Sequence, residues 1–223
     1  MSATAASSGS GFYSATIGKK IVMALSGLIL VGFVVGHMAG NLGVLRGAES
    51  FNHYAKLLRT SMPLLWAVRT VLFLSAALHF RAALQLYSLK AAARPVPYAK
   101  KGYRAASFAS RFMIWSGYAI AAFIVFHILH LTVGIAHSDF VEGEVYRNVV
   151  VAFQNPLVSG GYLVAMGLLF LHLRHGLYSF TQSLGLSHPR YIAIVKVLAN
   201  ALAALVAMGF AFIPVAVLAA LVK

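Results

Sequence analysis

The sequence contains no cysteine among its 223 residues. Disulfides, thiolate-ligated haem, cysteine-held iron–sulfur clusters and haem attached through a C-x-x-C-H motif are therefore excluded. Any metal must be held mainly by histidine, and the chain has nine histidines.

Charged residues are also scarce, at 10% of the chain, whereas a soluble domain has about 25%. Hydrophobic residues make up 61%, and the mean hydropathy is +0.84. A spanning helix needs about 20 mostly apolar residues, and continuous runs of this kind argue against a barrel of short alternating strands. We therefore expect an all-α integral membrane bundle of five transmembrane helices. The expected spans are 21–42, 63–88, 108–135, 157–180 and 197–222.

We expect a single transmembrane domain over residues 19–223. The leader at 1–18 that precedes it is rich in Ser, Ala and Gly and is expected to be mobile. Residues 48–61 mix apolar and polar residues at helical spacing. This segment predicts a short helix lying on the outer surface.

Acidic residues number four and fall in two of the four connections between spans. They are Glu49, Asp139, Glu142 and Glu144. The Lys/Arg excess lies in the other connections and before the first span, and the positive-inside rule then places the N-terminus in the cytoplasm and the C-terminus outside. The net charge of +14 therefore indicates anionic lipid or a docked cytoplasmic partner rather than nucleic acid. The acid-free run from Lys90 to Arg104 is the main candidate for that contact.

Each of the first four spans carries a histidine deep within its apolar run, namely His37, His79, His127 and His172. An ionisable side chain in hydrocarbon is costly and usually functional, and imidazole is the commonest metal ligand. His37 and His127 lie roughly 24 Å and 28 Å along spans that start in the cytoplasm. His79 and His172 lie roughly 22–24 Å along spans that start outside. The sequence therefore predicts an outer pair and an inner pair.

Two histidines at each level fit haem better than zinc, because a structural zinc site needs four protein ligands whereas haem needs two axial ones. His130 and His175 follow His127 and His172 by three residues, so spacing alone leaves the ligand choice open. The second histidine of each couple is a candidate for a haem propionate or a quinone. Arg81 and Arg174 are candidates for the inner propionates, with snorkelling to the headgroups as the alternative.

Glycines within the spans have two interpretations. They leave room for a flat porphyrin, or they allow close packing between helices. The glycines concerned are Gly32, Gly36, Gly40, Gly134, Gly167 and Gly176. His53, His137 and His188 fall in connections, where we expect solvated side chains.

An ordered set of motifs along the chain resembles a known family. The matching stretches are Gly36-His37, Asn41, Arg46-Gly47-Ala48-Glu49-Ser50-Phe51-Asn52, His79, Phe126-His127, Leu171-His172-Leu173-Arg174-His175-Gly176-Leu177-Tyr178-Ser179-Phe180 and Gly185. They resemble the dihaem cytochrome b membrane anchor of succinate:quinone oxidoreductases and fumarate reductases. The resemblance implies axial ligands at His37, His79, His127 and His172, with the first helix paired with the third and the second with the fourth. It also implies that helices one to four enclose the haems.

The resemblance implies a function in the bacterial cytoplasmic membrane. A flavoprotein subunit and an iron–sulfur subunit would carry out the dicarboxylate chemistry, since this chain has no flavin or nucleotide fingerprint. Two haems b would pass electrons to or from quinone, with menaquinone favoured. Glu49, His53 and His130 are the outer candidates for the proton that quinone chemistry requires.

Two other function classes stay open on the sequence. One is a cytochrome b subunit of another respiratory complex, such as a hydrogenase anchor. The other is a haem-free membrane transporter whose histidines bind ions or relay protons. Haem content and co-purifying subunits distinguish these classes.

Overall fold

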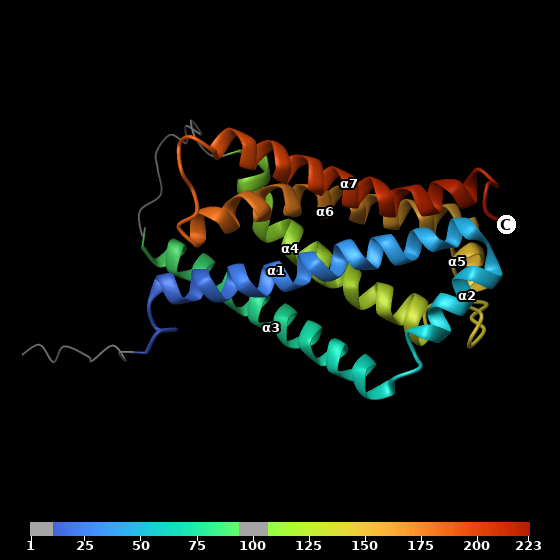
Figure 1. Cartoon of the computed structure of the whole chain (residues 1–223). Helices are drawn as coiled ribbons and strands as arrows, with labels where there is room; N and C mark the ends of the chain where they lie inside the picture. Colours follow the sequence, from blue (N-terminus) through green and yellow to red (C-terminus); the bar gives the residue numbers. More distant parts are fainter. Residues whose placement is uncertain (1–10, 94–106) are drawn as a thin grey trace, which may run out of the picture.

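The computed structural model describes residues 11–93 and 107–223, and within them the chain is helical with no strand. The helices are α1 (Thr16–Asn41), α2 (Ala48–Leu57), α3 (Met62–Ala92), α4 (Phe108–His127), α5 (Val145–Gln154), α6 (Pro156–Ser183) and α7 (Ile192–Leu218). A 3-10 turn, η1 (Leu42–Arg46), follows α1, and a π-helical turn, η2 (Ile128–Val133), follows α4. Five of these segments are long and apolar enough to cross a membrane, so the expected all-α five-span bundle is confirmed (Figure 1).

Local sequence explains where several helices begin. The Ser107 hydroxyl accepts a hydrogen bond from the Ser110 amide at the start of α4. Asn155 caps α6 in the same way, and Pro156 follows it at the first helical position, where a missing N–H costs nothing. The first helix begins at Thr16, inside the expected leader, and the Tyr13 hydroxyl donates a hydrogen bond to Gln85 Oε1 on α3. The described end of the leader is therefore tied to the bundle.

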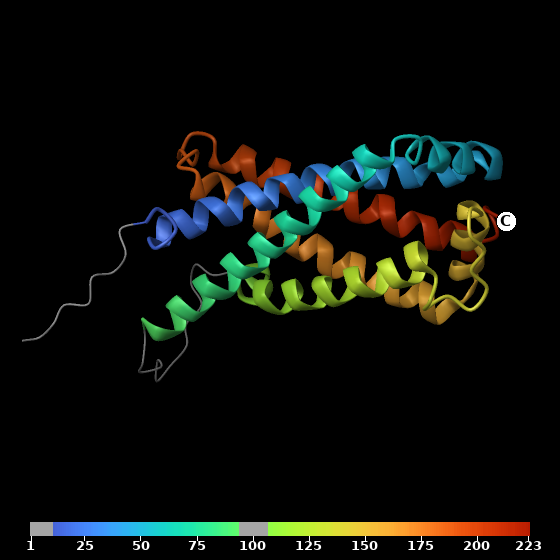
Figure 2. The ribbon, with the colours of Figure 1, turned by 90° about the horizontal axis from the view of Figure 1, so that it is seen from below.

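The bundle is built from neighbouring pairs of helices. α3 packs along α1, α4 packs along α6, and α7 packs along α6 and also contacts α1. In the described part of the chain, close backbone contacts are sparse between α1 and α4 and between α3 and α6. Figure 2 shows α1 and α4 on opposite sides of the bundle. Side chains that reach across the bundle from these diagonal helices therefore meet in its interior.

The fifth span, α7, packs closely against α1 and α6. Ala203 and Val206 of α7 are fully buried and pack with Met38 of α1 and Leu173 of α6. A Cβ added at Gly209 would collide with the Met38 side chain, so this glycine is needed for the close approach of α7 to α1. By contrast, α3 presents large apolar side chains such as Phe73 outward, as expected of a surface that faces lipid.

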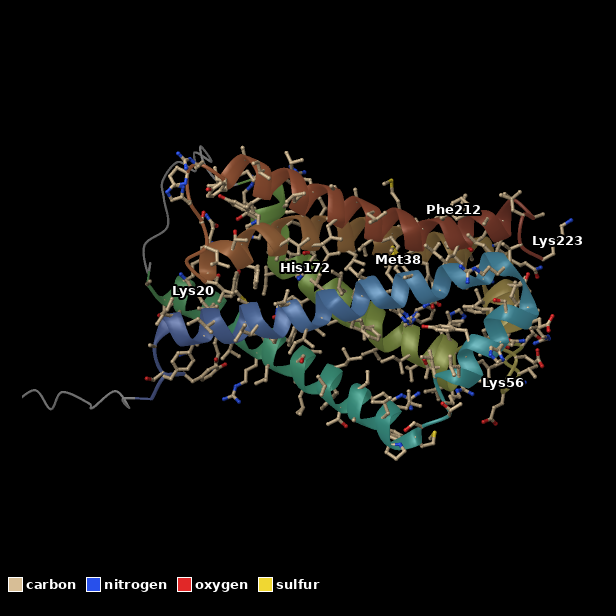
Figure 3. The ribbon with its side chains drawn as sticks, viewed as in Figure 1. Lys20, Met38, Lys56, His172, Phe212 and Lys223 are labelled. Carbon is tan, nitrogen blue, oxygen red and sulfur yellow. The ribbon has the colours of Figure 1, made fainter. Side chains whose placement is uncertain are left out.

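The two ends of the bundle differ in charge and in structure. We call them the Lys20 end and the Lys56 end, after residues labelled in Figure 3. The Lys20 end holds the start of α1, the end of α3 and the connection from α6 to α7. The Lys56 end holds α2, α5 and the C-terminus (Figure 1). All four acidic residues belong to the connections at the Lys56 end.

Two short helices cover the Lys56 end. The expected outer helix at 48–61 is present as α2, but α5 was not expected from the sequence. Phe51 of α2 and Phe153 of α5 are buried in one apolar cluster with Ile213 and Val217 of α7. Gly134 ends η2 with a φ of +87°, so its role is to terminate the turn in a left-handed conformation, not to make room between helices.

Candidate metal centres

The four expected histidines meet as two pairs. The rings of His37 on α1 and His127 on α4 have centroids 5.9 Å apart. The rings of His79 on α3 and His172 on α6 have centroids 6.3 Å apart. Each pair joins diagonal helices of the bundle, and the pairing agrees with the grouping by depth.

The two pairs lie at different levels. A Cβ added at Gly27 of α1 would lie 3.0 Å from His79, and one at Gly117 of α4 would lie 3.6 Å from His172. Gly27 precedes His37 by ten residues, and Gly117 precedes His127 by ten residues. Ten helical residues rise about 15 Å, and both helices therefore give the same separation. Figure 3 shows His172 nearer the Lys20 end and Met38, the neighbour of His37, nearer the Lys56 end.

The separation of the rings fits axial ligation of one iron. Two metal–nitrogen bonds of about 2 Å, plus about 1 Å from each nitrogen to its ring centre, place two opposed imidazoles about 6 Å apart. Among the described residues no group of three or more His, Cys, Asp or Glu is placed to hold a metal ion. A centre with two protein ligands suits a metal that carries its own equatorial ligands, as haem does.

The glycines of the spans divide into two groups. A Cβ at Gly40 would collide with the Tyr54 ring, so this glycine allows a close contact between α1 and α2. At Gly32 and Gly36 of α1 and at Gly167 and Gly176 of α6, an added Cβ would meet nothing within 4 Å. Close helix packing therefore does not explain these four glycines, whereas space beside the histidine-bearing helices is compatible with a porphyrin.

Each histidine of the pair nearer the Lys20 end, the expected inner pair, has a hydrogen-bond partner at Nδ1. His79 Nδ1 lies 3.0 Å from the carbonyl oxygen of Met23, which can only accept, so Nδ1 carries the proton. His172 Nδ1 lies 3.2 Å from the Ser116 hydroxyl, and that hydroxyl donates to the Met113 carbonyl. The hydroxyl is then free to accept from His172. In both rings Nε2 is left without the proton, as an axial ligand requires.

The outer histidines are held differently. His127 Nδ1 lies 3.3 Å from the Tyr162 hydroxyl. His37 stacks on Phe33 with centroids 5.1 Å apart, and Phe210 of α7 lies at 5.8 Å. The Asn41 amide nitrogen donates to the His37 carbonyl at 2.8 Å and also faces the ring, at 3.2 Å from Nδ1 and 3.4 Å from Nε2. The His37 ring is therefore oriented by packing against Phe33 and Phe210 and by the Asn41 amide, and not by a carbonyl acceptor.

The other expected site residues do not join these pairs. His130 is 3% exposed and contacts Tyr162 and the ring of His137, whose centroid is 5.1 Å away. His175 is half-buried, one turn from His172. The Arg81 guanidinium lies over the Tyr13 ring, and Arg174 is exposed.

Three further expectations concern the connections. Glu49 and His53 of α2 are exposed, as is His188. His137 is not solvated as expected. It is 9% exposed, its Nε2 lies 3.0 Å from the Asn148 carbonyl, and its Nδ1 accepts from the Asp139 amide.

Sequence reasoning missed four residues around the histidines. Ser116 contacts His172 and Tyr162 contacts His127. A Cβ added at Gly27 or Gly117 would meet His79 or His172. Ser116-Gly117 is a pair of small residues, one of them polar, within an apolar span and at the depth of the expected inner pair. This feature could have indicated a contact with a histidine. Tyr162 has no such signal, because tyrosine is common near the ends of spans.

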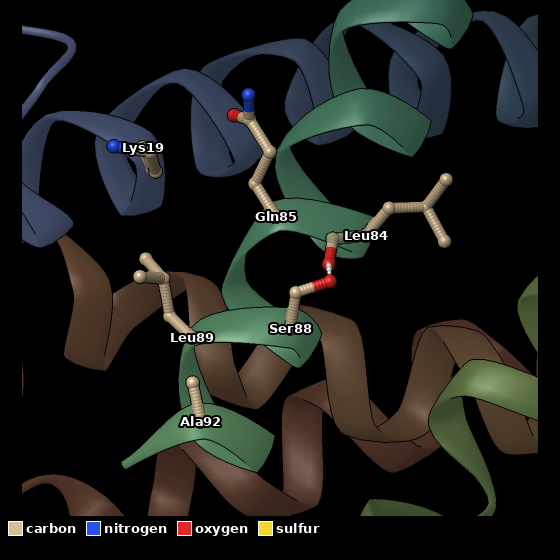
Figure 4. Close-up of a pocket in the computed structure, with 6 residues that line it drawn as sticks. All are labelled: Lys19, Leu84, Gln85, Ser88, Leu89 and Ala92. Atoms are coloured by element: carbon tan, nitrogen blue, oxygen red, sulfur yellow. Dashed lines mark hydrogen bonds between the residues drawn. The ribbon is translucent and has the colours of Figure 1, made fainter.

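Two surface hollows lie at opposite ends of the bundle. The one at the Lys20 end, of about 410 Å³, lies against α1 and α3 (Figure 4). Its Ser88 hydroxyl donates to the Leu84 carbonyl, and Lys19 donates to the Tyr13 and Ser14 carbonyls, so the remaining surface is mainly apolar. The hollow at the Lys56 end, of about 380 Å³, is lined by Arg59, Leu131, Thr132, Val133, Phe140, Glu142, Gly143, Val145 and Asn148.

Comparisons of the chain with protein-family models, curated proteins and solved structures find no match. What the protein does is therefore inferred from its own residues and their geometry.

Proposed function

We propose that this chain is a dihaem cytochrome b that anchors a succinate:quinone oxidoreductase or fumarate reductase in the bacterial cytoplasmic membrane. The observation that carries the proposal is the pairing of four intramembrane histidines from four helices. The ring centroids lie 5.9 Å apart in one pair and 6.3 Å apart in the other. Trans-axial ligation of iron predicts about this separation.

Each histidine pair would hold one haem b, which supplies a one-electron redox centre when bound. His79 and His172 would hold the inner haem, and His37 and His127 the outer one. The Met23 carbonyl and the Ser116 hydroxyl orient the inner rings through Nδ1. The levels are about 15 Å apart, so electrons would cross half or more of the roughly 30 Å hydrocarbon core between them.

The proposed orientation places the Lys20 end in the cytoplasm. Lys19, Lys20, Lys90, Arg190 and Lys196 belong to segments at this end, and no acidic residue does. A flavoprotein subunit and an iron–sulfur subunit would dock here, next to the inner haem. The run from Lys90 to Arg104 is part of the proposed contact, although residues 94–106 lie outside those that the structure describes.

A test of the docking surface changes Lys100, Lys101 and Arg104 to Ser. Partner subunits should then be retained more weakly, and the loss should grow at high salt because screening weakens the exposed charges that remain. Unchanged co-purification across salt concentrations would show that this basic run sets the membrane topology and does not hold the partner subunits. Labelling of a cysteine placed at position 100 from outside the cell would contradict the orientation.

Quinone would react at the opposite end, near the outer pair, with menaquinone favoured. The hollow at the Lys56 end combines the apolar side chains of Leu131 and Phe140 with the charged Arg59 and Glu142. It therefore offers both an apolar surface for a quinone ring and a carboxylate for the proton. None of the candidates Glu49, His53 and His130 lines this hollow, whereas Glu142 does, so Glu142 becomes the stronger candidate.

The inner arginines keep their proposed role as partners of the haem propionates. Arg81 already lies over the ring of Tyr13, so a propionate would share the guanidinium with that ring. Arg174 is exposed on α6, two residues beyond His172, and His175 is one turn away.

The decisive experiment measures haem per chain and the redox components of single variants. The wild type should carry two b haems with low-spin spectra. His79→Ala and His172→Ala should remove one and the same component in a potentiometric titration, and His37→Ala and His127→Ala should remove the other. Loss of a component in His130→Ala or His175→Ala, with that component retained in His127→Ala or His172→Ala, would refute the ligand assignment.

Absence of haem from the purified protein would refute the proposed function and favour a transporter. Two haems together with hydrogenase subunits, and no flavoprotein, would place the chain in a different respiratory complex.

A further inference from the structure

Tyr162 of α6 occupies a fixed position beside the outer pair. Its side chain is 6% exposed. Phe153 and Phe123 lie edge-on to its ring, with centroids at 4.9 Å and 5.0 Å, and Phe126 lies at 6.0 Å. A ring enclosed on several sides cannot rotate away, so the place of its hydroxyl is set by packing.

The Tyr162 hydroxyl lies between two imidazoles. His127 Nδ1 is 3.3 Å from the oxygen, and His130 Nδ1 is 3.0 Å from it. A phenol carries one proton to donate and can also accept. The hydroxyl can donate to only one of the two histidines, so at least one of them donates to it, and all three groups are used when the other accepts the phenolic proton.

The direction of these hydrogen bonds follows from ligation. If His127 binds iron through Nε2, its proton is on Nδ1 and is donated to Tyr162. The hydroxyl then donates to His130 Nδ1. The ring of His130 stacks on Phe126 and on His137, with both centroids at 5.1 Å. The chain of hydrogen bonds thus ends on a ring that is itself held in place.

The π-helical turn η2 begins directly after His127 and contains His130. Turns of this kind are rare and often lie at functional sites. Residues three apart share one face of a helix, and both His127 and His130 reach the same hydroxyl, while Gly134 ends the turn in a left-handed conformation.

We propose that Tyr162 is the positioning residue of the outer haem, with His130 as the acceptor that supports it. This inference rests on the proposed function. A hydroxyl that accepts from Nδ1 orients the His127 ring and increases its basicity, so that it donates more charge to iron. A hydroxyl that also donates to His130 is the better acceptor, because linked hydrogen bonds strengthen one another. Both effects favour oxidised iron.

The test is Tyr162→Phe in the intact complex, with redox titration resolved into the outer and inner components defined by the ligand variants. Phe keeps the packing against Phe153 and Phe123 and removes the hydroxyl. The outer midpoint potential should rise, the inner one should stay, and the outer haem should dissociate about 10-fold or more faster. Ser116→Ala is the matched control, because it removes the hydroxyl next to His172 and should move the inner component alone.

A second variant tests the supporting role and remains informative if Tyr162→Phe does not accumulate. His130→Phe removes the acceptor of the tyrosine proton and should raise the outer potential by less than Tyr162→Phe does. An unchanged outer potential in Tyr162→Phe would show that Tyr162 only packs. An unchanged outer potential in His130→Phe would show that His130 does not act on the haem through Tyr162. Wild-type protein without two haems would refute the proposed function instead, so the two failures are distinguishable.

Discussion

Gly27 faces the inner histidine pair, and adding one methyl group there tests the geometry of that pair. In Gly27→Ala the new Cβ would lie 3.0 Å from His79 Cε1 and 3.1 Å from Nδ1. Carbon atoms normally approach to about 3.5–4.0 Å, so the His79 ring has to move by a few tenths of an ångström. Metal–ligand distances tolerate about 0.2 Å. The movement also stretches the 3.0 Å hydrogen bond from Nδ1 to the Met23 carbonyl.

We therefore expect Gly27→Ala to weaken retention of the inner haem by about 10-fold or more, as loss of an orienting partner does. Alanine favours a helix over glycine by about 1 kcal/mol, so helix propensity does not explain such a loss. The assay is haem content with redox titration of purified protein. The control is Gly117→Ala, whose Cβ would make an ordinary contact with His172 at 3.6 Å and should leave both haems in place. An unaltered inner component in Gly27→Ala would mean that His79 does not occupy the position described.

Two further predictions concern the Lys56 end. Glu142→Gln should slow quinone turnover by about 10²-fold, the contribution expected of a proton-transferring carboxylate, while Glu49→Gln should leave turnover unchanged. The measurement is a quinone reductase assay, and equal effects of the two variants would contradict the assignment of the quinone to this hollow. Asn148→Ala removes two side-chain hydrogen bonds to the Val141 backbone, of 2.9 Å and 2.7 Å, and should lower the free energy of unfolding by about 1–3 kcal/mol. The measurement is denaturation in detergent, with the exposed His53→Ala as the control. A change in the free energy of unfolding no larger than that of the control would show that other contacts hold the loop around Val141.

The sequence was sufficient for the architecture and the histidine pairing because both depend on simple periodic features. Long apolar runs mark spans whatever their neighbours are, and the expected limits differ from those of the observed spans by about five residues or fewer when η2 is counted with α4. The direction of each span then sets the depth of its histidine, since the helical rise is constant. His37 and His127 were grouped on that basis, and their rings do meet.

Features that depend on contacts between helices were not predictable in this way. The segment Val145–Gln154 is too short and mixed to be recognised as a span, and it becomes helix α5 where it packs against α2 and α7. His137 lies in a connection, yet hydrogen bonds to the Asn148 carbonyl and the Asp139 amide bury it. Spacing alone also left His127 and His130 open, because they are one turn apart in the sequence, and in the structure it is the ring of His127 that faces His37.

The difference between the two pairs suggests how one fold tunes two similar centres. At the inner pair, Nδ1 of His79 meets a backbone carbonyl and that of His172 a serine hydroxyl bonded to a carbonyl. At the outer pair, His127 meets a tyrosine hydroxyl. The Asn41 amide nitrogen lies beside both ring nitrogens of His37 and cannot accept a hydrogen bond, so it would not accept the Nδ1 proton of an iron-bound His37. A carbonyl acceptor strengthens an imidazole ligand, whereas a donor does not. The proposed inner haem should therefore have the lower potential, so that electrons run downhill from the Lys20 end towards the Lys56 end.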